Sequence, residues 1–265
     1  EYTEMADYFY ETLLDLKTLS QGLNGIYRDF LTKLRDKVGN VAYWDLYCKP
    51  VLGTLAVAQA PLLPDQIASF SGVPIDSVGT ILIVIRQFWE QMGMEGGYQY
   101  YHPSFGEYLI SDKNPDCISG IESHKRIVTS YRDGAHAWTD VDWSQVDDYG
   151  MHHLPAHLVG AGEFETLQEL LLNFDWLQAK LEATDVTALI ADYGLRSWEG
   201  GSSVQVVIDA LRRSADVLSM AHSQLAGQLL GRLLASNDPQ VQNLLVHTRA
   251  YHGVPWLRPL TASLD

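Results

Sequence analysis

The amino-acid sequence predicts a mainly α-helical protein: a winged helix with one small β-hairpin, followed by an α-helical array or short solenoid. Three observations support this fold class. Apolar residues recur at helical spacing along most of the 265 residues. A helix-turn-helix pattern is followed directly by a short alternating stretch around two glycines. The second half of the chain is a series of short amphipathic segments separated by polar breaks.

The first helices are predicted from residue spacing. Apolar residues at helical intervals predict a helix over residues 2–16. The next stripe predicts a second helix, with apolar side chains at Ile26, Tyr27, Phe30, Leu31 and Leu34. Gly39 ends that helix, and a more apolar helix over residues 44–60 must then accommodate Pro50 near its start.

The helix-turn-helix pattern is the most informative stretch. It predicts a short helix over residues 63–71 and a second helix over residues 74–91. Ala68 supplies a small residue where the helices touch, Gly72 suits a left-handed turn, and Val78 is a β-branched residue that locks the second helix. Weak alternation around Gly96-Gly97 then predicts a hairpin, which completes the winged-helix order.

The rest of the chain is predicted to be helical. The segment 103–110 has Pro103 at the favoured first helical position, with Phe105, Tyr108 and Leu109 on one face. Asp185 and Asp238 are typical helix caps. The further predicted helices are 117–131, 143–159, 164–172, 176–181, 186–193, 204–220, 225–234 and 240–251.

Composition limits the classes of partner. Hydrophobic residues make up 46% of the chain, so a substantial core can form. Acidic residues outnumber basic ones by 33 to 18, and the formal charge is −15. Such a chain is repelled by nucleic acid and by anionic membranes. With two cysteines and no apolar run of membrane-spanning length, the sequence predicts a soluble, cytoplasmic protein without nucleic-acid or membrane partners.

Several enzyme signatures are missing from the sequence. A phosphate-binding P-loop needs glycines before a Lys-Ser or Lys-Thr pair, but Lys17-Thr18 follows "LLDL". The sequence contains no G-x-G-x-x-G after a strand, no G-x-S-x-G and no H-E-x-x-H. We therefore expect a chain that is not an enzyme.

Four segments together resemble the NACHT and NB-ARC class of STAND ATPases, in particular bacterial members with a WD-repeat C-terminus. The segments are "GLNGIYRDFL", "PLLPDQIASFSGVPIDSV", "YQYYHPSFGEYL" and "YGMHHLPAHLVGAGEFETLQELLLNFDWLQAKL". A fifth segment, "LLGRLLASNDPQVQNLLVHTRAYHGVPWLRPLTASL", resembles the one that leads into the WD-repeat propeller of those bacterial members. These ATPases are switch proteins of apoptosis, innate immunity and plant resistance. The resemblance spans nearly the whole chain and is strongest over residues 142–182 and 225–264.

The resemblance implies that the chain is an internal piece of a larger protein. Residues 1–40 would be the C-terminal part of a helical domain, 41–114 the winged-helix domain, and 115–265 a helical arm leading to a sensor or repeat domain. Its partners would be the nucleotide-binding and C-terminal repeat domains of the same protein, and the resemblance allows for a homo-oligomer on activation. ADP or ATP is implied for the parent protein, whereas this chain, lacking Walker motifs, would bind no cofactor itself.

His102 is the candidate binding residue. Its place before the helix "PSFGEYL" matches the histidine of the family's Met-His-Asp motif, which implies a contact with an ADP phosphate in the parent protein. Tyr101 and Pro103 flank it, so only the histidine itself matches. A protonation-dependent, charge-assisted hydrogen bond to a diphosphate is chemically reasonable. The alternative is that His102 only caps the following helix.

The other polar and aromatic groups have simpler interpretations. His153 and His157 have zinc-ligand spacing, but Pro155 lies between them and His152 falls on another face, so we expect no metal site. We expect solvated carboxylates at Glu163, Glu165 and Glu169, and packing anchors at Trp143, Trp176 and Trp198. The aromatic strip 98–101 lacks the cations of a nucleic-acid surface, since residues 61–113 carry six acids against Arg86 and Lys113.

Three function classes follow from these observations. The first is a regulatory relay module that holds the nucleotide core closed and couples it to a sensor. The second is a stand-alone winged-helix transcription regulator with a helical ligand-binding or dimerisation domain; a basic recognition helix would favour it, but "DSVGTILIVIRQFWEQ" has one arginine. The third, a hydrolase built on the helical array, has no motif behind it.

Overall fold

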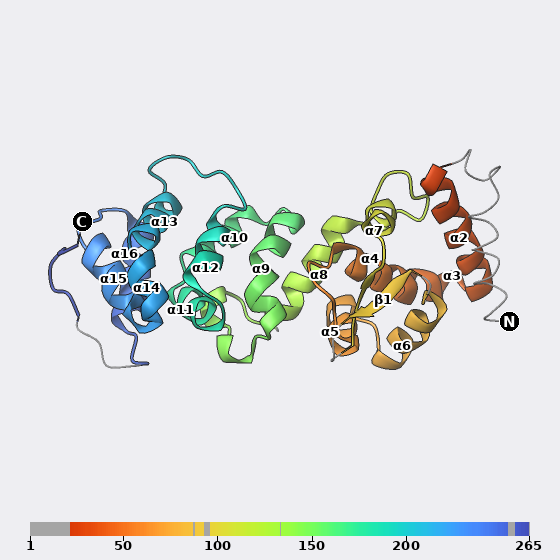
Figure 1. Ribbon diagram of the computed structural model, residues 1–265, viewed down its shortest axis with the longest axis horizontal. Coiled ribbons are helices and arrows are strands. Elements are labelled where there is room, and N and C mark those ends of the chain that lie inside the picture. The colour runs from red at the N-terminus through yellow and green to blue at the C-terminus, as the bar shows by residue number, and fades with distance from the viewer. Residues whose placement is uncertain (1–21, 87, 93–95, 133, 254–257, 265) are drawn as a thin grey trace. The chain divides into compact units, whose positions relative to one another are not determined.

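The computed structural model describes residues 22–86, 88–92, 96–132, 134–253 and 258–264. The helix expected at residues 2–16 lies outside this part of the chain. The chain divides into two compact units, Glu1–Ser130 and Tyr131–Asp265 (Figure 1). The structure is mainly α-helical with a helical array, as predicted. The expected boundaries after residues 40 and 114 both fall inside the first unit and stay predictions.

The first unit begins with helix α2 (Gly22–Val38), on which the predicted apolar stripe is confirmed. The five side chains of this stripe are all buried: Ile26, Tyr27, Phe30, Leu31 and Leu34. Gly39 follows the helix with a φ of 62°, a left-handed conformation that suits glycine at a helix end. The Asn40 side chain then accepts a hydrogen bond from the Tyr43 backbone nitrogen and caps the next helix.

The helix expected over residues 44–60 differs in detail. It is made of α3 (Val41–Tyr43), the π-helical turn η2 (Trp44–Cys48) and α4 (Lys49–Val57), so it ends three residues earlier than expected. The π-helical turn ends two residues before Pro50, which has no N–H for a helical hydrogen bond and whose ring crowds the preceding turn. The change from π-helical to α-helical hydrogen bonding therefore occurs next to Pro50.

The predicted helix-turn-helix is formed by α5 (Pro64–Ser71) and α6 (Ile75–Val84), which are bent by 110° at the turn. Gly72 has a φ of 69°, and its N–H donates to the Ala68 carbonyl at 3.0 Å. Val78 is fully buried, as expected. Among the described residues, no single helix has the length and apolar composition to cross a membrane; only this bent pair taken together passes that test.

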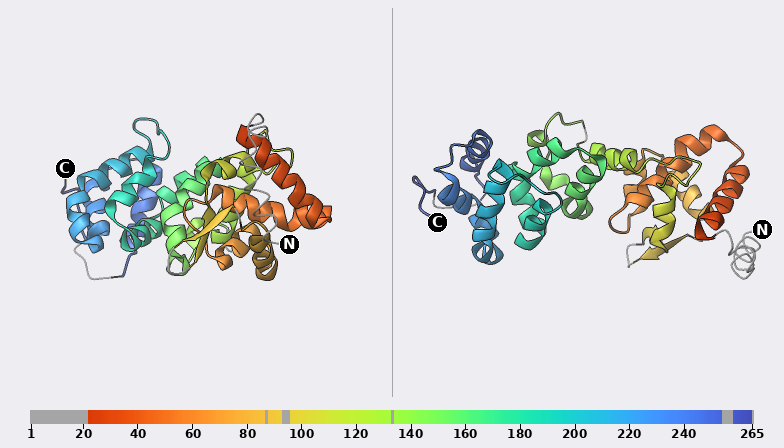
Figure 2. Two further views of the ribbon diagram at one scale, coloured as in Figure 1. Left: turned by 45° about the vertical axis from the view of Figure 1, so that its right-hand side comes forward. Right: turned by 90° about the horizontal axis from the view of Figure 1, so that it is seen from above.

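A two-stranded antiparallel hairpin follows, formed by β1 (Trp89–Met92) and β2 (Gly97–Tyr100). The helix expected over residues 74–91 is therefore wrong beyond Val84. Residues 89–92 belong to the hairpin because the backbone of β2 takes its hydrogen-bond partners there, with Trp89 opposite Tyr100 and Met92 opposite Gly97. Figure 2 shows the hairpin beside the helices of this unit.

Helices α7 (Pro103–Leu109) and α8 (Gly120–Arg132) follow the hairpin. The apolar face predicted for α7 is confirmed, since Phe105, Tyr108 and Leu109 are all buried. The start of the next helix was expected at Cys117 but lies at Gly120. Cys117 has a φ of 52° and therefore cannot continue an α-helix.

The second unit is an array of short, mostly antiparallel helices (Figures 1 and 2). Consecutive helices pack on one another around a core rich in leucine. The elements are η3 (Trp138–Asp140), η4 (Trp143–Gln145), α9 (Asp148–Ala161), α10 (Phe164–Leu171), α11 (Phe174–Ala183), α12 (Val186–Tyr193), α13 (Ser203–Arg213), α14 (Ala215–Met220), η5 (His222–Gln224), α15 (Leu225–Leu233) and α16 (Pro239–Arg249).

Two of the helices expected in this unit are broken. The helix expected over 143–159 is interrupted before Asp147, whose side chain accepts from the Gly150 backbone nitrogen at 2.8 Å and caps α9. The helix expected over 204–220 is interrupted at Ser214, whose hydroxyl bonds back to Ala210. In both cases a short polar side chain competes for backbone hydrogen bonds.

Candidate functional site

His102 lies where β2 leads into α7, and its side chain caps that helix. Its Nδ1 accepts a hydrogen bond from the Ser104 backbone nitrogen at 3.3 Å and lies 2.7 Å from Ser104 Oγ. The contact that the structure describes is therefore the helix cap, the alternative considered for this residue. The ring is exposed, so it can also reach a polar group outside the unit. An exposed imidazole nitrogen fits an anionic oxygen such as that of a phosphate.

Two residues that the sequence did not point to lie beside His102. Ser104 Oγ is 2.8 Å from the Tyr27 hydroxyl, although the two residues are 77 positions apart. Tyr27 is buried, and its ring packs against Phe105 and Tyr108 with centroid distances of 5.1 and 5.6 Å. Because no spacing rule links α2 to α7, only the folded structure shows this contact.

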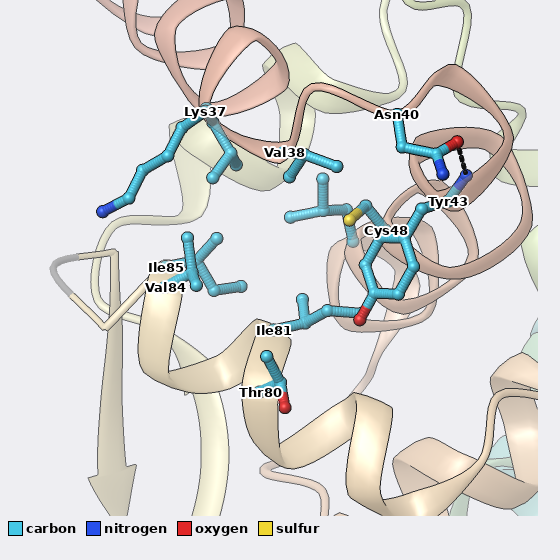
Figure 3. Close-up of a pocket in the computed structure, with 11 residues that line it drawn as sticks. Lys37, Val38, Asn40, Tyr43, Cys48, Thr80, Ile81, Val84 and Ile85 are labelled. Carbon is cyan, nitrogen blue, oxygen red and sulfur yellow. Dashed lines mark hydrogen bonds between the residues drawn. The ribbon is translucent and has the colours of Figure 1, made fainter.

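A cavity of about 410 Å³ lies in the first unit among α2, η2 and α6 (Figure 3). Its walls are largely apolar, and Val38, Cys48 and Ile81 contribute to them. Burial raises the pKa of the Cys48 thiol to about 11, so the thiol stays protonated and is a poor nucleophile at neutral pH. The cavity can accommodate an apolar group, and Lys37 and Tyr43 also contribute to its lining.

The three histidines of α9 have separate environments. His157 is fully buried, with its Nε2 2.9 Å from the Tyr149 hydroxyl, whereas the His152 ring contacts Asp148 in the first turn. Burial is the main cause that lowers the pKa of His153. In the part of the chain that the structure describes, no group of three potential metal ligands is found.

A buried ion pair joins two helices of the second unit. Lys180 of α11 is 1% exposed, and its Nζ lies 3.1 Å from Asp192 Oδ2 of α12. The same Nζ donates to the Met151 carbonyl of α9 at 2.6 Å. Pro155 lies four residues after Met151 and has no N–H, so it cannot make the helical bond to that carbonyl. Lys180 supplies the missing donor.

Asp192 completes this arrangement by balancing the Lys180 charge. Burial raises the pKa of the Asp192 carboxyl to about 6, while the Lys180 charge and hydrogen bond act in the opposite direction. The three helices α9, α11 and α12 are thus joined by one polar cluster inside an apolar core. The sequence carried one signal of it, because a proline inside a helix predicts an unpaired carbonyl four residues earlier.

The tryptophans and carboxylates behave largely as expected. Trp143 and Trp176 are buried, and their ring centroids lie 5.0 Å apart. Trp198 is half-buried, and its Nε1 donates to the Tyr193 carbonyl. Glu165 and Glu169 are exposed on α10, whereas Glu163, the residue before that helix, is half-buried. These residues form packing contacts and a mostly solvated face.

A comparison with protein families matches residues 121–197 to the APAF-1 helical domain. This segment contains most of α8 and all of α9 to α12, including Pro155, Lys180 and Asp192. At a coarse level the match fits the STAND ATPases. A search of curated proteins gives no match.

Proposed function

We propose that this chain is a non-catalytic regulatory segment of an Apaf-1-like STAND ATPase. It holds the nucleotide-binding core closed and couples that core to a C-terminal sensor. The observation that carries the proposal is the match of residues 121–197 to the APAF-1 helical domain. The helical array around this segment supports it, because closely packed helices suit a rigid connection between domains.

The proposed partners are two domains of the same protein. A nucleotide-binding domain would contact the first unit, and a C-terminal repeat domain would follow the helical arm. Residues 41–114 would form the winged helix, an assignment supported by the order α5, α6 and hairpin. Homo-oligomer formation on activation belongs to the same proposal.

In this proposal His102 holds a terminal phosphate of ADP. The nucleotide supplies an anionic oxygen when it is bound, and the exposed imidazole supplies an N–H donor. One charge-assisted hydrogen bond of this kind contributes about 1.5–3 kcal/mol. The bond would favour the closed state of the parent protein. Pro103 stands where the family motif has an acid, so ring orientation must depend on other residues of this chain.

The alternative function is a winged-helix transcription regulator. A measurement of DNA binding distinguishes this alternative from the regulatory segment of an ATPase. We expect negligible affinity of the 265-residue chain for random duplex DNA at low salt, measured by fluorescence anisotropy. Phosphate neutralisation is the first requirement of DNA binding, and α6 carries Asp76 but no lysine or arginine. Binding in the micromolar range would contradict the regulatory proposal and favour the regulator of transcription.

A further inference from the structure

An open cleft of about 550 Å³ lies in the second unit, with walls from η4, α11 and the residues that follow α16. Three exposed acidic residues line it, namely Asp142, Asp175 and Glu182. Among the described residues that line it there is no lysine and no arginine. A hollow lined by charges of one sign concentrates the field and attracts an ion of the opposite sign. We call it the acidic cleft.

The carboxylates of the acidic cleft have unused acceptor oxygens. Asp175 makes no hydrogen bond or ion pair with another residue that the structure describes. Asp142 uses only Oδ1, which accepts from the backbone nitrogen and the hydroxyl of Ser144. Glu182 uses only Oε1, which accepts from Gln178 Nε2 at 2.7 Å. Within the described part of the chain no basic side chain balances these charges, so a cation that binds here displaces no ion pair.

A buried amide in the wall of the acidic cleft is a second, independent observation. Gln178 is only 5% exposed, and its Oε1 is buried without a hydrogen-bond partner among the described residues. Its Nε2 donates to Glu182, which holds the amide at the cleft wall and identifies the unpaired atom as the oxygen. Because an unpaired buried carbonyl oxygen costs free energy, a ligand N–H that reaches it is bound favourably.

Two aromatic side chains complete the walls of the acidic cleft. Trp143 is buried against Trp176, and its Nε1 has no hydrogen-bond partner in the described structure. Tyr251 packs edge-on against Phe174, with the ring centroids 5.3 Å apart. Burial and then the Glu182 charge raise the pKa of Tyr251, which agrees with a phenol close to that carboxylate. Aromatic rings next to carboxylates favour a cation with a delocalised charge.

We propose that the acidic cleft binds the guanidinium group of an arginine side chain from a partner protein. The unused side-chain oxygens of three carboxylates and of Gln178 are all acceptors, and a guanidinium has five N–H donors and no acceptor. Its planar group also pairs with carboxylates through two parallel hydrogen bonds and stacks on aromatic rings, which a lysine ammonium does not. The proposal involves neither nucleotide nor His102, so it is independent of the proposed function.

The test is an NMR titration of the 265-residue chain, labelled with nitrogen-15 at its seven tryptophans, at low salt. The ligand is arginine with an acetylated α-amino group and an amidated carboxyl group, and Trp143→Phe identifies the Trp143 indole signal. We expect this signal to shift saturably, with a dissociation constant in the millimolar range. The lysine analogue should bind about threefold more weakly or worse, and the uncharged citrulline analogue should cause no shift.

Two matched triple variants separate the acidic cleft from the general attraction of an acidic chain. Asp142→Asn, Asp175→Asn and Glu182→Gln together should weaken binding about tenfold or more, at about two- to fivefold for each lost ion pair. The control combines Glu165→Gln, Glu169→Gln and Glu199→Gln, which remove the same charge from exposed positions outside the cleft, and should bind as the wild type does.

Three results would overturn the proposal. The first is the absence of a saturable shift of the Trp143 signal with the arginine ligand. The second is an equal loss of affinity in the two triple variants, since this would show attraction by net charge alone. The third is equal binding of the arginine and lysine ligands, which would exclude recognition of the guanidinium group.

Discussion

Lys180→Met is expected to lower the free energy of unfolding of the second unit by about 3–5 kcal/mol, the usual cost of removing one partner from a buried ion pair. Methionine has a similar length but no charge, so Asp192 would be left buried without its cation. The Met151 carbonyl would lose its donor as well. Chemical denaturation followed by circular dichroism measures the change.

Two further variants separate this effect from general sensitivity to substitution. Lys125→Met changes an exposed lysine of α8 and should alter stability by no more than about 0.5 kcal/mol. Pro155→Ala restores an N–H opposite the Met151 carbonyl, so Lys180 becomes less important. In a double-mutant cycle the two changes should couple by about 0.5–1.5 kcal/mol. Strict additivity would contradict the role assigned to Lys180.

Trp176→Ala is expected to lower the free energy of unfolding by about 3–5 kcal/mol, as for other fully buried aromatic residues. Trp176 is completely buried and packs edge-on against Trp143. The side chain also lies under the Lys180 ammonium, 5.8 Å from Nζ. Removing the ring would therefore leave a cavity beside a buried charge.

Thermal and denaturant unfolding of Trp176→Ala and Trp198→Ala test this expectation together. Trp198 is only half-buried, so its removal creates a smaller cavity and should cost less. An equal loss in the free energy of unfolding for the two substitutions would show that burial of Trp176 contributes no more to stability than that of Trp198.

Most helices of this protein were predictable from residue spacing and from the residues at helix ends. Gly72 ends α5 in the expected left-handed turn, and the stripe of α2 is buried as its spacing predicts. The predicted helix bounds are wrong where a hydrogen-bond partner elsewhere in the chain determines the secondary structure. Residues 89–92 have enough apolar character for a helix, but pairing with 97–100 makes them a strand. The interruption before Asp147 depends on a cap that competes with continuous helix.

The candidate site was predictable only in part. The place of His102 directly before α7 was predictable, and the structure has the residue there as the N-cap; its contact with a phosphate stays a prediction. Ser104 and Tyr27 were not found, because a serine and a tyrosine in amphipathic helices carry no sign of their contact. For the Lys180–Asp192 pair the sequence signals only the unpaired Met151 carbonyl, through Pro155; the pair itself is buried by tertiary packing, since charged residues in helices are usually solvated.

The most direct test is the rate at which ADP leaves the complete ATPase that we propose contains this segment. The account predicts that His102→Ala accelerates ADP release about tenfold or more, because one charge-assisted hydrogen bond to phosphate is lost. His136→Ala, which changes an exposed histidine of the second unit, serves as the control and should release ADP at the wild-type rate. An unchanged release rate in His102→Ala would contradict the account and leave His102 as a helix cap alone.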